Sequence, residues 1–219
     1  MIDTRQTGTM AILLCAAAFG CPALAQSDTE ADSGDVPVEE IVVTSKRRSQ
    51  PLADHAGNSS VMDSDEIHAV GHQHIHELMT RVPGVWLSRG SGQEHLTAIR
   101  SPVLSGAGSC GGFLFLEDGI PIRPSGFCNV NQMFELNTEQ AGRIEVIRGP
   151  GNALFGSNAL HGIINVLTPD PAALPGANVS LEMGANDFLR LRGELAGSPA
   201  RPIRAAIVYT DDGGFRDAS

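Results

Sequence analysis

Short apolar runs, separated by turns rich in glycine, proline and asparagine, fill the chain between residues 60 and 170. The runs at residues 144–147 and 163–167 flank one such turn segment and are predicted to be strands. Residues 113–116 and 120–122 lie on either side of a Glu-Asp-Gly sequence, which is a signal for a tight β-hairpin.

The same region also carries helix signals. Acidic residues at 63–66 indicate a helix start, and residues 67–79 predict one or two short helices with a break at Gly71. A Pro-Gly turn then leads to predicted strands at 85–88 and 96–100. Short strands mixed with helices predict an α+β domain, a small mixed sheet with short helices, over this whole region.

The pattern changes after residue 175. Residues 177–184, 188–196 and 203–210 alternate apolar with polar or small side chains and are joined by short turns. Segments of roughly this length are typical of the wall of a transmembrane β-barrel, in which residues 176–219 would be the first antiparallel strands. A water-soluble antiparallel sheet gives the same pattern. Three strands cannot close a barrel, and an open sheet edge is not tolerated in lipid.

Residues 1–25 have the features of a secretory signal peptide. A basic start at Arg5, an apolar run at residues 10–21 and an Ala-Leu-Ala sequence predict cleavage before Gln26. A membrane-spanning helix is the alternative, but the run is shorter than the roughly 20 apolar residues that spanning requires.

Charge and cysteine content narrow the classes of partner. A net charge of −10 argues against nucleic-acid binding. After export, Cys110 and Cys128 would meet an oxidising compartment, where disulfides persist. We expect them to form a bridge that closes a loop and contributes roughly 3 kcal/mol, with two free thiols as the alternative.

Residues 26–59 are predicted to be a flexible N-terminal segment. Its acidic first half, residues 26–40, cannot bury enough apolar surface to offset the entropy lost on ordering. A β-prone patch follows, which consists of Ile41, Val42, Val43 and Thr44. The patch is either the first strand of the next domain or a docking peptide that adds a strand to another protein's sheet.

The strand predicted at 144–147 is unusual because charged residues lie in and beside it. Arg143, Glu145 and Arg148 cannot sit in a plain hydrophobic core, since an unpaired buried charge is very costly. Little in the rest of the chain looks able to supply their partners.

Four motifs, standing in this order, carry a resemblance to TonB-dependent outer-membrane receptors. They are residues 77–78 with 81–85, residues 97–100, residues 115–121, and residues 143–150 with 153–156 and 162–165. The resemblance implies that residues 60–170 are the plug domain and that residues near 41–45 are the TonB box, which binds the C-terminal domain of TonB.

In that family the plug fills a barrel of about 22 strands. The resemblance therefore implies that Arg100 and Arg148 form ion pairs with carboxylates of the barrel wall. It also implies that the sequence is incomplete, because the predicted strands are too few to form such a barrel.

The outward side of the plug is expected to receive the ligand. The candidate contact residues are Ser105, Ser109, Ser125, Phe127, Asn129 and Asn131. A G-x-G-x-x-G match at residues 106–111 does not predict a dinucleotide site, because a strand follows it rather than a helix. No nucleophile and base stand in a recognisable motif, so we expect no catalytic residue, no cofactor and no enzyme.

Four histidines lie close together at His68, His72, His74 and His76. Some of them have the spacing that a helical metal site uses. The break at Gly71 and the expected exposure favour a solvated polar face instead, with no metal ligand among them.

The sequence as a whole predicts the N-terminal part of a receptor that imports a scarce ligand with energy delivered through TonB. The ligand would be a siderophore, haem, cobalamin or a glycan, and the location the outer membrane, with lipid around the barrel. Two alternatives are a soluble periplasmic binding module with the plug fold and a periplasmic metal-binding protein.

Overall fold

The structure is a computed structural model, and its described residues fall into several stretches. They are residues 42–44, 50–51, 58–90, 92–105, 112–124, 132–151, 153–171 and 176–214. The predicted signal peptide, both cysteines of the predicted bridge and Ile41 lie outside them.

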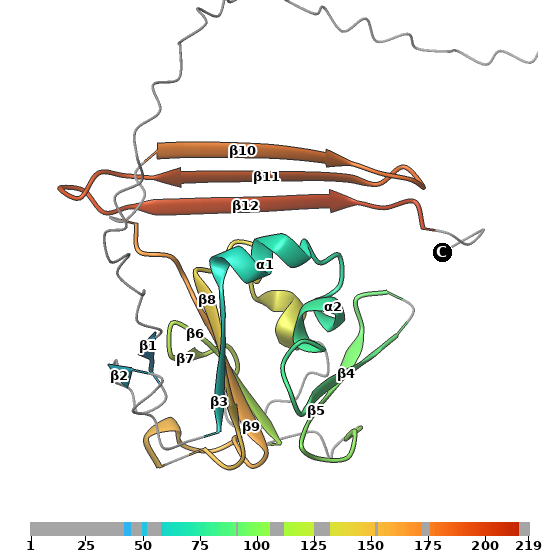
Figure 1. Ribbon diagram of the computed structural model, residues 1–219, viewed down its shortest axis with the longest axis vertical. Coiled ribbons are helices and arrows are strands. Elements are labelled where there is room, and N and C mark those ends of the chain that lie inside the picture. Colours follow the sequence, from blue (N-terminus) through green and yellow to red (C-terminus); the bar gives the residue numbers. More distant parts are fainter. Residues whose placement is uncertain are drawn as a thin grey trace, which may run out of the picture. The chain divides into compact units, whose positions relative to one another are not determined.

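A five-stranded mixed sheet is the centre of residues 58–171, which we call the mixed-sheet domain (Figure 1). In spatial order its strands are β3 (Ser59–Asp63), β8 (Arg143–Arg148), β9 (Gly162–Leu167), β6 (Phe113–Glu117) and β7 (Ile120–Pro121). β6 and β9 run parallel, and the other neighbours are antiparallel. These strands confirm the predicted apolar runs and the hairpin.

Two short helices follow β3, as the sequence predicts. α1 (Ser64–Val70) begins where the Asp63 carboxylate accepts a hydrogen bond from the Glu66 N–H at 2.8 Å. It ends at Gly71, whose left-handed φ of 55° an L-residue would adopt only with strain. α2 (Ile75–Met79) follows. Among the described residues, no helix has the length and apolar character needed to cross a membrane.

A separate antiparallel hairpin comes next in the chain. It consists of β4 (Val85–Arg89) and β5 (His95–Ile99), which pair along their full length. Two 3₁₀ turns, η3 (Gln132–Glu135) and η4 (Ala153–Phe155), complete the mixed-sheet domain.

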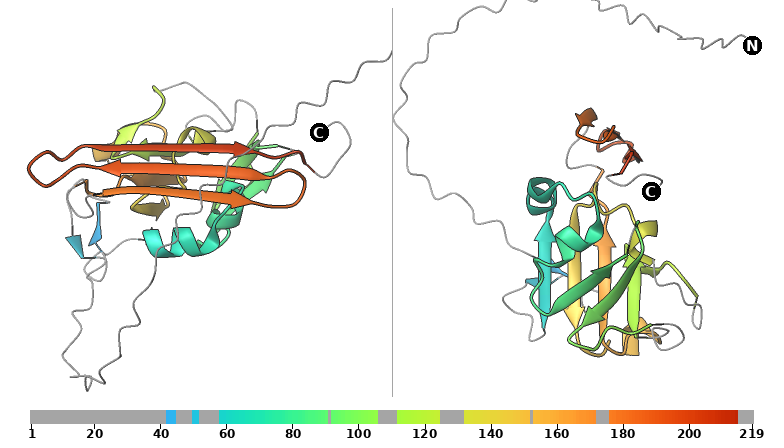
Figure 2. Two further views of the ribbon diagram at one scale, coloured as in Figure 1. Left: turned by 90° about the horizontal axis from the view of Figure 1, so that it is seen from above. Right: turned by 90° about the vertical axis from the view of Figure 1, so that its right-hand side faces the viewer.

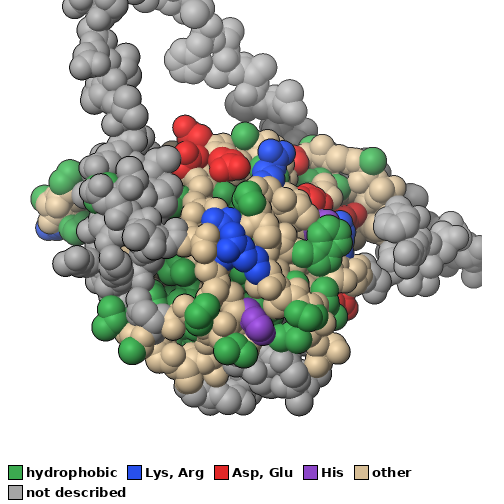
Figure 3. All heavy atoms as spheres, turned by 60° about the horizontal axis from the view of Figure 1, so that its bottom comes forward, with side chains coloured by type: hydrophobic (Ala, Val, Ile, Leu, Met, Phe, Trp, Pro, Cys, Tyr) green, Lys and Arg blue, Asp and Glu red, His purple; other side chains and the backbone are tan. Residues whose placement is uncertain are grey.

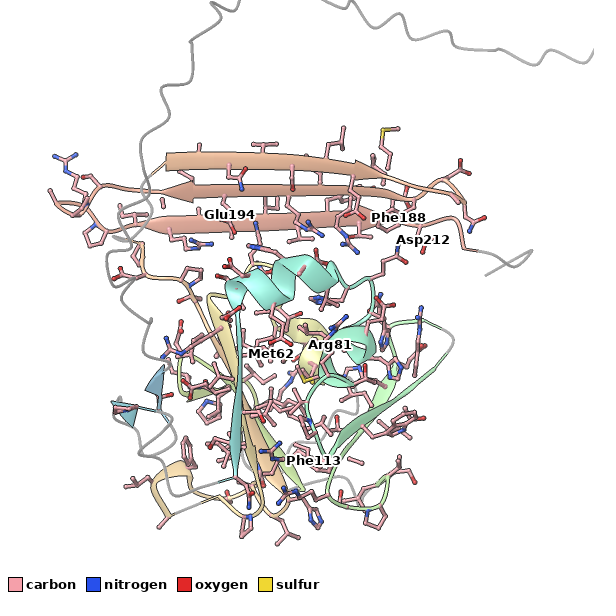
Figure 4. The ribbon with its side chains drawn as sticks, in the orientation of Figure 1. Met62, Arg81, Phe113, Phe188, Glu194 and Asp212 are labelled. Atoms are coloured by element: carbon pink, nitrogen blue, oxygen red, sulfur yellow. The ribbon has the colours of Figure 1, made fainter. Side chains whose placement is uncertain are left out.

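Side-chain alternation gives the sheet two different faces. Ile144 and Val146 of β8 and Ile164 of β9 point to the larger core, which α1, α2, β4, β5 and η3 cover (Figure 2). Met62 and Phe113 belong to the same core (Figure 4). The second face has a smaller apolar cluster, made of Leu114, Leu116, Phe155, Ala159 and Ile163. Arg143 and Glu145 of β8 lie on this second face, whereas Arg148, which shares the alternation of Ile144 and Val146, lies on the first.

The last described strands form a three-stranded antiparallel sheet, as predicted. They are β10 (Gly176–Met183), β11 (Leu189–Ala196) and β12 (Arg204–Asp211), each paired over its full length. Its exposed large apolar side chains are Val179, Leu181, Met183, Leu191, Leu195, Ile207 and Tyr209.

Two isoleucines provide a matched test of the core. Ile164 is 0% exposed in the larger core, whereas Ile120 is 69% exposed in β7. We expect Ile164→Ala to lower the free energy of unfolding by about 2–5 kcal/mol, because the buried side chain leaves a cavity. Ile120→Ala should change it by less than about 0.5 kcal/mol. Chemical denaturation of the chain measures both values, and equal effects would contradict this assignment of the core.

Candidate functional site

The predicted docking segment contacts the second face of the sheet through Thr44. The backbone N–H and the hydroxyl of Thr44 both donate hydrogen bonds to Oε2 of Glu145, at 2.9 and 2.7 Å. Asn165 donates from Nδ2 to the same hydroxyl at 3.3 Å. Thr44 directly follows β1 (Val42–Val43), which pairs with β2 (Gln50–Pro51). The segment is therefore fixed to the two central strands by a few polar contacts.

The expectation that the charges of β8 lack partners within the chain is wrong for two of them. Glu145 is 1% exposed, and its Oε1 accepts a hydrogen bond from Nε of Arg143 at 3.0 Å. The physical reason is the strand period: Arg143 and Glu145 are two residues apart and share one face. Thr44 then completes the carboxylate's hydrogen bonding from a distant part of the sequence.

The polar contacts continue into the β6–β7 turn. Oδ1 of Asn165 accepts a hydrogen bond from the Gly119 N–H at 3.0 Å. The carboxylate of Asp118 accepts from both the N–H and the hydroxyl of Thr168, each at 2.9 Å. Asp118 and Gly119 both have positive φ, as the tight hairpin requires. The turn is thus fastened to the end of β9.

Arg100 and Arg148, the predicted partners of wall carboxylates, lie next to each other. Arg148 donates from Nη1 to the Pro83 carbonyl at 2.8 Å and from Nη2 to the Ser59 carbonyl at 3.3 Å. Burial, together with the positive charge of Arg100, lowers the pKa of Arg148. No carboxylate of the described residues lies within 4.0 Å of either guanidinium. Figure 3 shows basic side chains gathered in the middle of one face.

A second arginine cluster was not predicted as a site. Arg190 of β11 is 1% exposed and lies 3.6 Å from the Glu139 carboxylate and 3.4 Å from that of Glu182. It also donates to the His72 carbonyl at 3.0 Å, while Arg192 donates to Glu139 at 2.8 Å. In β11 the side chains of Arg190, Arg192 and Glu194 lie on the face opposite the leucines. This alternation is the sequence pattern from which a charged cluster could have been predicted. These contacts tie β11 to the mixed-sheet domain.

The prediction that the histidines form a solvated face is wrong for His72 and His74. His72 is 4% exposed and its Nε2 lies 3.0 Å from the Thr138 hydroxyl, while His74 is completely buried. Burial is the main cause that lowers the pKa of His72, and the Glu139 carboxylate opposes it. His68 is exposed, as expected. Among the described residues, no three His, Cys, Asp or Glu side chains are grouped to hold a metal ion.

The predicted ligand contacts remain a prediction. Ser105 is exposed. The other candidates, together with the two cysteines, lie outside the described residues: Ser109, Ser125, Phe127, Asn129, Asn131, Cys110 and Cys128. A cavity of about 570 Å³ is lined by residues that include His72, Thr138, Glu139, Thr210 and Asp212, and Ser105, the one candidate within the described residues, does not line it.

The small mixed sheet with short helices, followed by three antiparallel strands with an exposed apolar face, has the form of a plug domain and the first strands of a barrel. A family profile, "TonB-dependent Receptor Plug Domain", matches residues 51–163, just over half of the chain. The chain belongs to the TonB-dependent receptor plug domain family.

One relative agrees with this family assignment. The chain is 34% identical over 180 residues to the vitamin B12 transporter BtuB of Vibrio vulnificus (strain CMCP6), which covers 82% of this chain and 28% of that protein. The chain thus spans little more than a quarter of that relative's length.

The fold resembles that of the pyoverdine outer membrane receptor FpvA from Pseudomonas aeruginosa PAO1 bound to pyoverdine. The TM-score is 0.60 at 21% identity, over 80% of this chain and 25% of that one. For the FpvAI–pyocin S2 complex the TM-score is 0.62 at 22% identity, over 80% of this chain and 23% of that one. For the alcaligin outer membrane receptor FauA from Bordetella pertussis it is 0.59 at 15% identity, over 78% and 29%.

The Arg190 cluster can be tested with two arginines of the same region. We expect Arg190→Met to lower the free energy of unfolding by roughly 2–4 kcal/mol, because it leaves buried polar partners without their donor. Arg201→Met, at an exposed turn, should change it by less than about 0.5 kcal/mol. Denaturant titration of the two variants measures the difference. If Arg190→Met were as mild as Arg201→Met, the cluster would not hold β11 to the mixed-sheet domain.

Proposed function

We propose that the chain is the N-terminal part of a TonB-dependent outer-membrane receptor that imports a scarce ligand. In this proposal residues 1–25 direct export, residues 26–59 carry the TonB box, residues 60–170 are the plug, and residues 176–219 begin the barrel. Membership of the plug domain family supports it. So does the relative, a transporter rather than an enzyme.

The observation that carries the proposal is the pair Arg100 and Arg148. The side chains of both arginines lie against Gly84, and Arg148 is partly buried; among the described residues, no carboxylate lies within 4.0 Å of either guanidinium group. Like charges in such a place repel, and partly buried charges need partners of opposite sign. Carboxylates on the inner wall of a barrel around the plug would supply them.

The outer surface of the three-stranded sheet supports the same proposal. β11 directs Leu191 and Leu195 to one side and its charged residues to the other, where Arg190 contacts the mixed-sheet domain. A wall strand with lipid outside and a filled interior needs this division. The occupant of the apolar side is, in the proposal, the lipid of the outer membrane.

Residues Ile41, Val42, Val43 and Thr44 are the proposed TonB-binding segment. β1 pairs over only two residues, and Thr44 holds the plug by a few polar contacts. A segment attached so lightly can exchange its partner for the edge of another sheet. Pulling on it would then open the less stable part of the plug.

The names of two similar proteins support a ligand class. The relative is named as a transporter of vitamin B12, and one structural neighbour is named as a receptor bound to pyoverdine. We therefore propose a metal chelate such as cobalamin or a ferric siderophore. Its proposed contacts are the outward residues Ser105, Ser109, Ser125, Phe127, Asn129 and Asn131.

The docking segment can be tested with the isolated C-terminal domain of TonB. We expect Val43→Pro to weaken binding by about tenfold or more, because proline removes a backbone donor from the added strand. Val36→Pro, upstream of the patch, is the control and should bind as the unchanged chain does. Calorimetric titration of the purified chains measures the affinities. In the full-length receptor, Val43→Pro should also abolish uptake of labelled cyanocobalamin or a ferric siderophore. Equal binding by both variants would refute the assignment.

The arginine pair predicts an effect whose sign depends on the wall. In the chain alone, Arg100→Gln should raise the free energy of unfolding by a few tenths of a kcal/mol, because it relieves repulsion of Arg148. In the full-length receptor the same substitution should destabilise the plug by more than that, because it leaves a wall carboxylate unpaired. Thermal unfolding of both proteins measures the two signs. Stabilisation in both would show that no wall carboxylate meets Arg100.

A further inference from the structure

The imidazole of His74 acts as the N-terminal cap of α2. Its Nδ1 accepts a hydrogen bond from the backbone N–H of His76 at 3.0 Å. An imidazole nitrogen can accept only while it carries no proton. This contact therefore requires a neutral ring with its proton on Nε2, and the ring is completely buried.

The surroundings of His74 disfavour a charged ring. Burial is the largest cause that lowers the pKa of His74, followed by the positive charge of Arg89 at the end of β4, then by His95 of β5 and His76 of α2. The Gln93 carbonyl acts in the opposite direction. Two carboxylates complete the local charges. Glu77 of α2 lies 3.6 Å from Arg89, and the pKa of exposed Glu94 is lowered mainly by hydrogen bonds from the backbone N–H groups of Glu94 and Gly92, with a smaller effect of His74.

The cap connects α2 with the β4–β5 hairpin. His76, whose N–H is capped, lies with its Nδ1 2.5 Å from the Leu87 carbonyl. Its ring meets that of Trp86 edge to face, with 5.6 Å between centroids. His74 itself packs edge to face against His95 at 6.0 Å. Loss of the cap therefore affects both the start of α2 and its attachment to β4 and β5.

We propose that His74 is an acid-sensitive latch: protonation of its ring opens the cap of α2 and loosens the corner formed by α2, β4 and β5, while the five-stranded sheet stays formed. The added proton goes to Nδ1, which changes from acceptor to donor and leaves the His76 N–H without its partner. The latch depends only on this local geometry and is independent of the proposed transport function.

The direction of the pH effect follows from linkage. The pKa of His74 in the folded chain is lower than its ordinary value of 6.5, so the unfolded ring binds protons more readily. The stabilisation is therefore fully present above pH 6.5 and is lost as the pH falls from there towards the folded-state pKa. His72 and His95 are also buried with lowered pKa values and contribute to global stability with the same sign. The test must therefore be local to α2.

The experiment is amide hydrogen exchange of the full chain at several pH values between 7.5 and 5, corrected for intrinsic exchange rates. We expect opening at the His76 and Glu77 amides to increase about fivefold or more relative to β8 and β9 at the acid end. In His74→Asn this increase should disappear, because asparagine offers a capping oxygen that does not titrate. His68→Asn, at an exposed histidine, is the matched control and should behave like the unchanged chain.

Two results would overturn the latch. One is an equal acid-induced increase at α2 in His74→Asn and in the unchanged chain. The other needs no variant: nitrogen NMR of the unchanged chain reports which ring nitrogen of His74 carries the proton. A neutral ring protonated at Nδ1 would exclude the cap. Should His74→Asn fail to fold, this NMR measurement decides the question.

Discussion

The structure depends on how one buried carboxylate is satisfied. Glu145 lies in the second strand of the five-stranded sheet, where a lone charge would destabilise the fold. Arg143 on the same face and Thr44 from the docking segment complete its hydrogen bonds. Glu145 in the sheet and Thr44 in the proposed TonB-binding segment therefore belong to one hydrogen-bonded group. A pull on Thr44 acts first on this group and on Asn165 of the neighbouring strand.

The chain uses arginine in two different ways. Arg190 is already paired, through Glu139, Glu182 and backbone carbonyls, and it holds the three-stranded sheet to the mixed-sheet domain. Arg148 donates to backbone carbonyls and lies near Arg100, and neither has a carboxylate partner among the described residues. In the proposed receptor the contacts of Arg190 would attach the plug to the first strands of the barrel wall. Arg100 and Arg148 would be the group that the rest of the wall neutralises.

The pattern of apolar and polar residues predicts helices, strands and turns better than it predicts which side chains contact each other. Most strands, the break at Gly71 and the Asp118-Gly119 hairpin were predictable, because each rests on local spacing or turn chemistry. β2 (Gln50–Pro51) and β3 (Ser59–Asp63) were not predicted as strands. The pairing of Glu145 with Thr44 joins residues far apart in sequence, so no local pattern reveals it. The burial of His72 and His74 was missed for a related reason. These histidines lie between the two helices, and they are packed against His95 of β5 and Arg190 of β11, which come later in the chain. Arg190 had a visible pattern, but two of its partners, Glu139 and the His72 carbonyl, are far from it in sequence. The family was recognisable because its motifs lie at such local turns.

The order of strands in the sheet has a consequence for biogenesis. β3 pairs with β8, and β6 pairs in parallel with β9. These pairs of strands therefore cannot form until β8 and β9, near the end of the mixed-sheet domain, have been synthesised. Long sequence separation between paired strands slows folding, because loop closure must precede the contacts that reward it. A polypeptide that cannot assemble its sheet early stays unfolded for longer while it is synthesised. In the proposed receptor, whose residues 1–25 direct export, that delay would keep the chain in the unfolded state that a translocation pore requires.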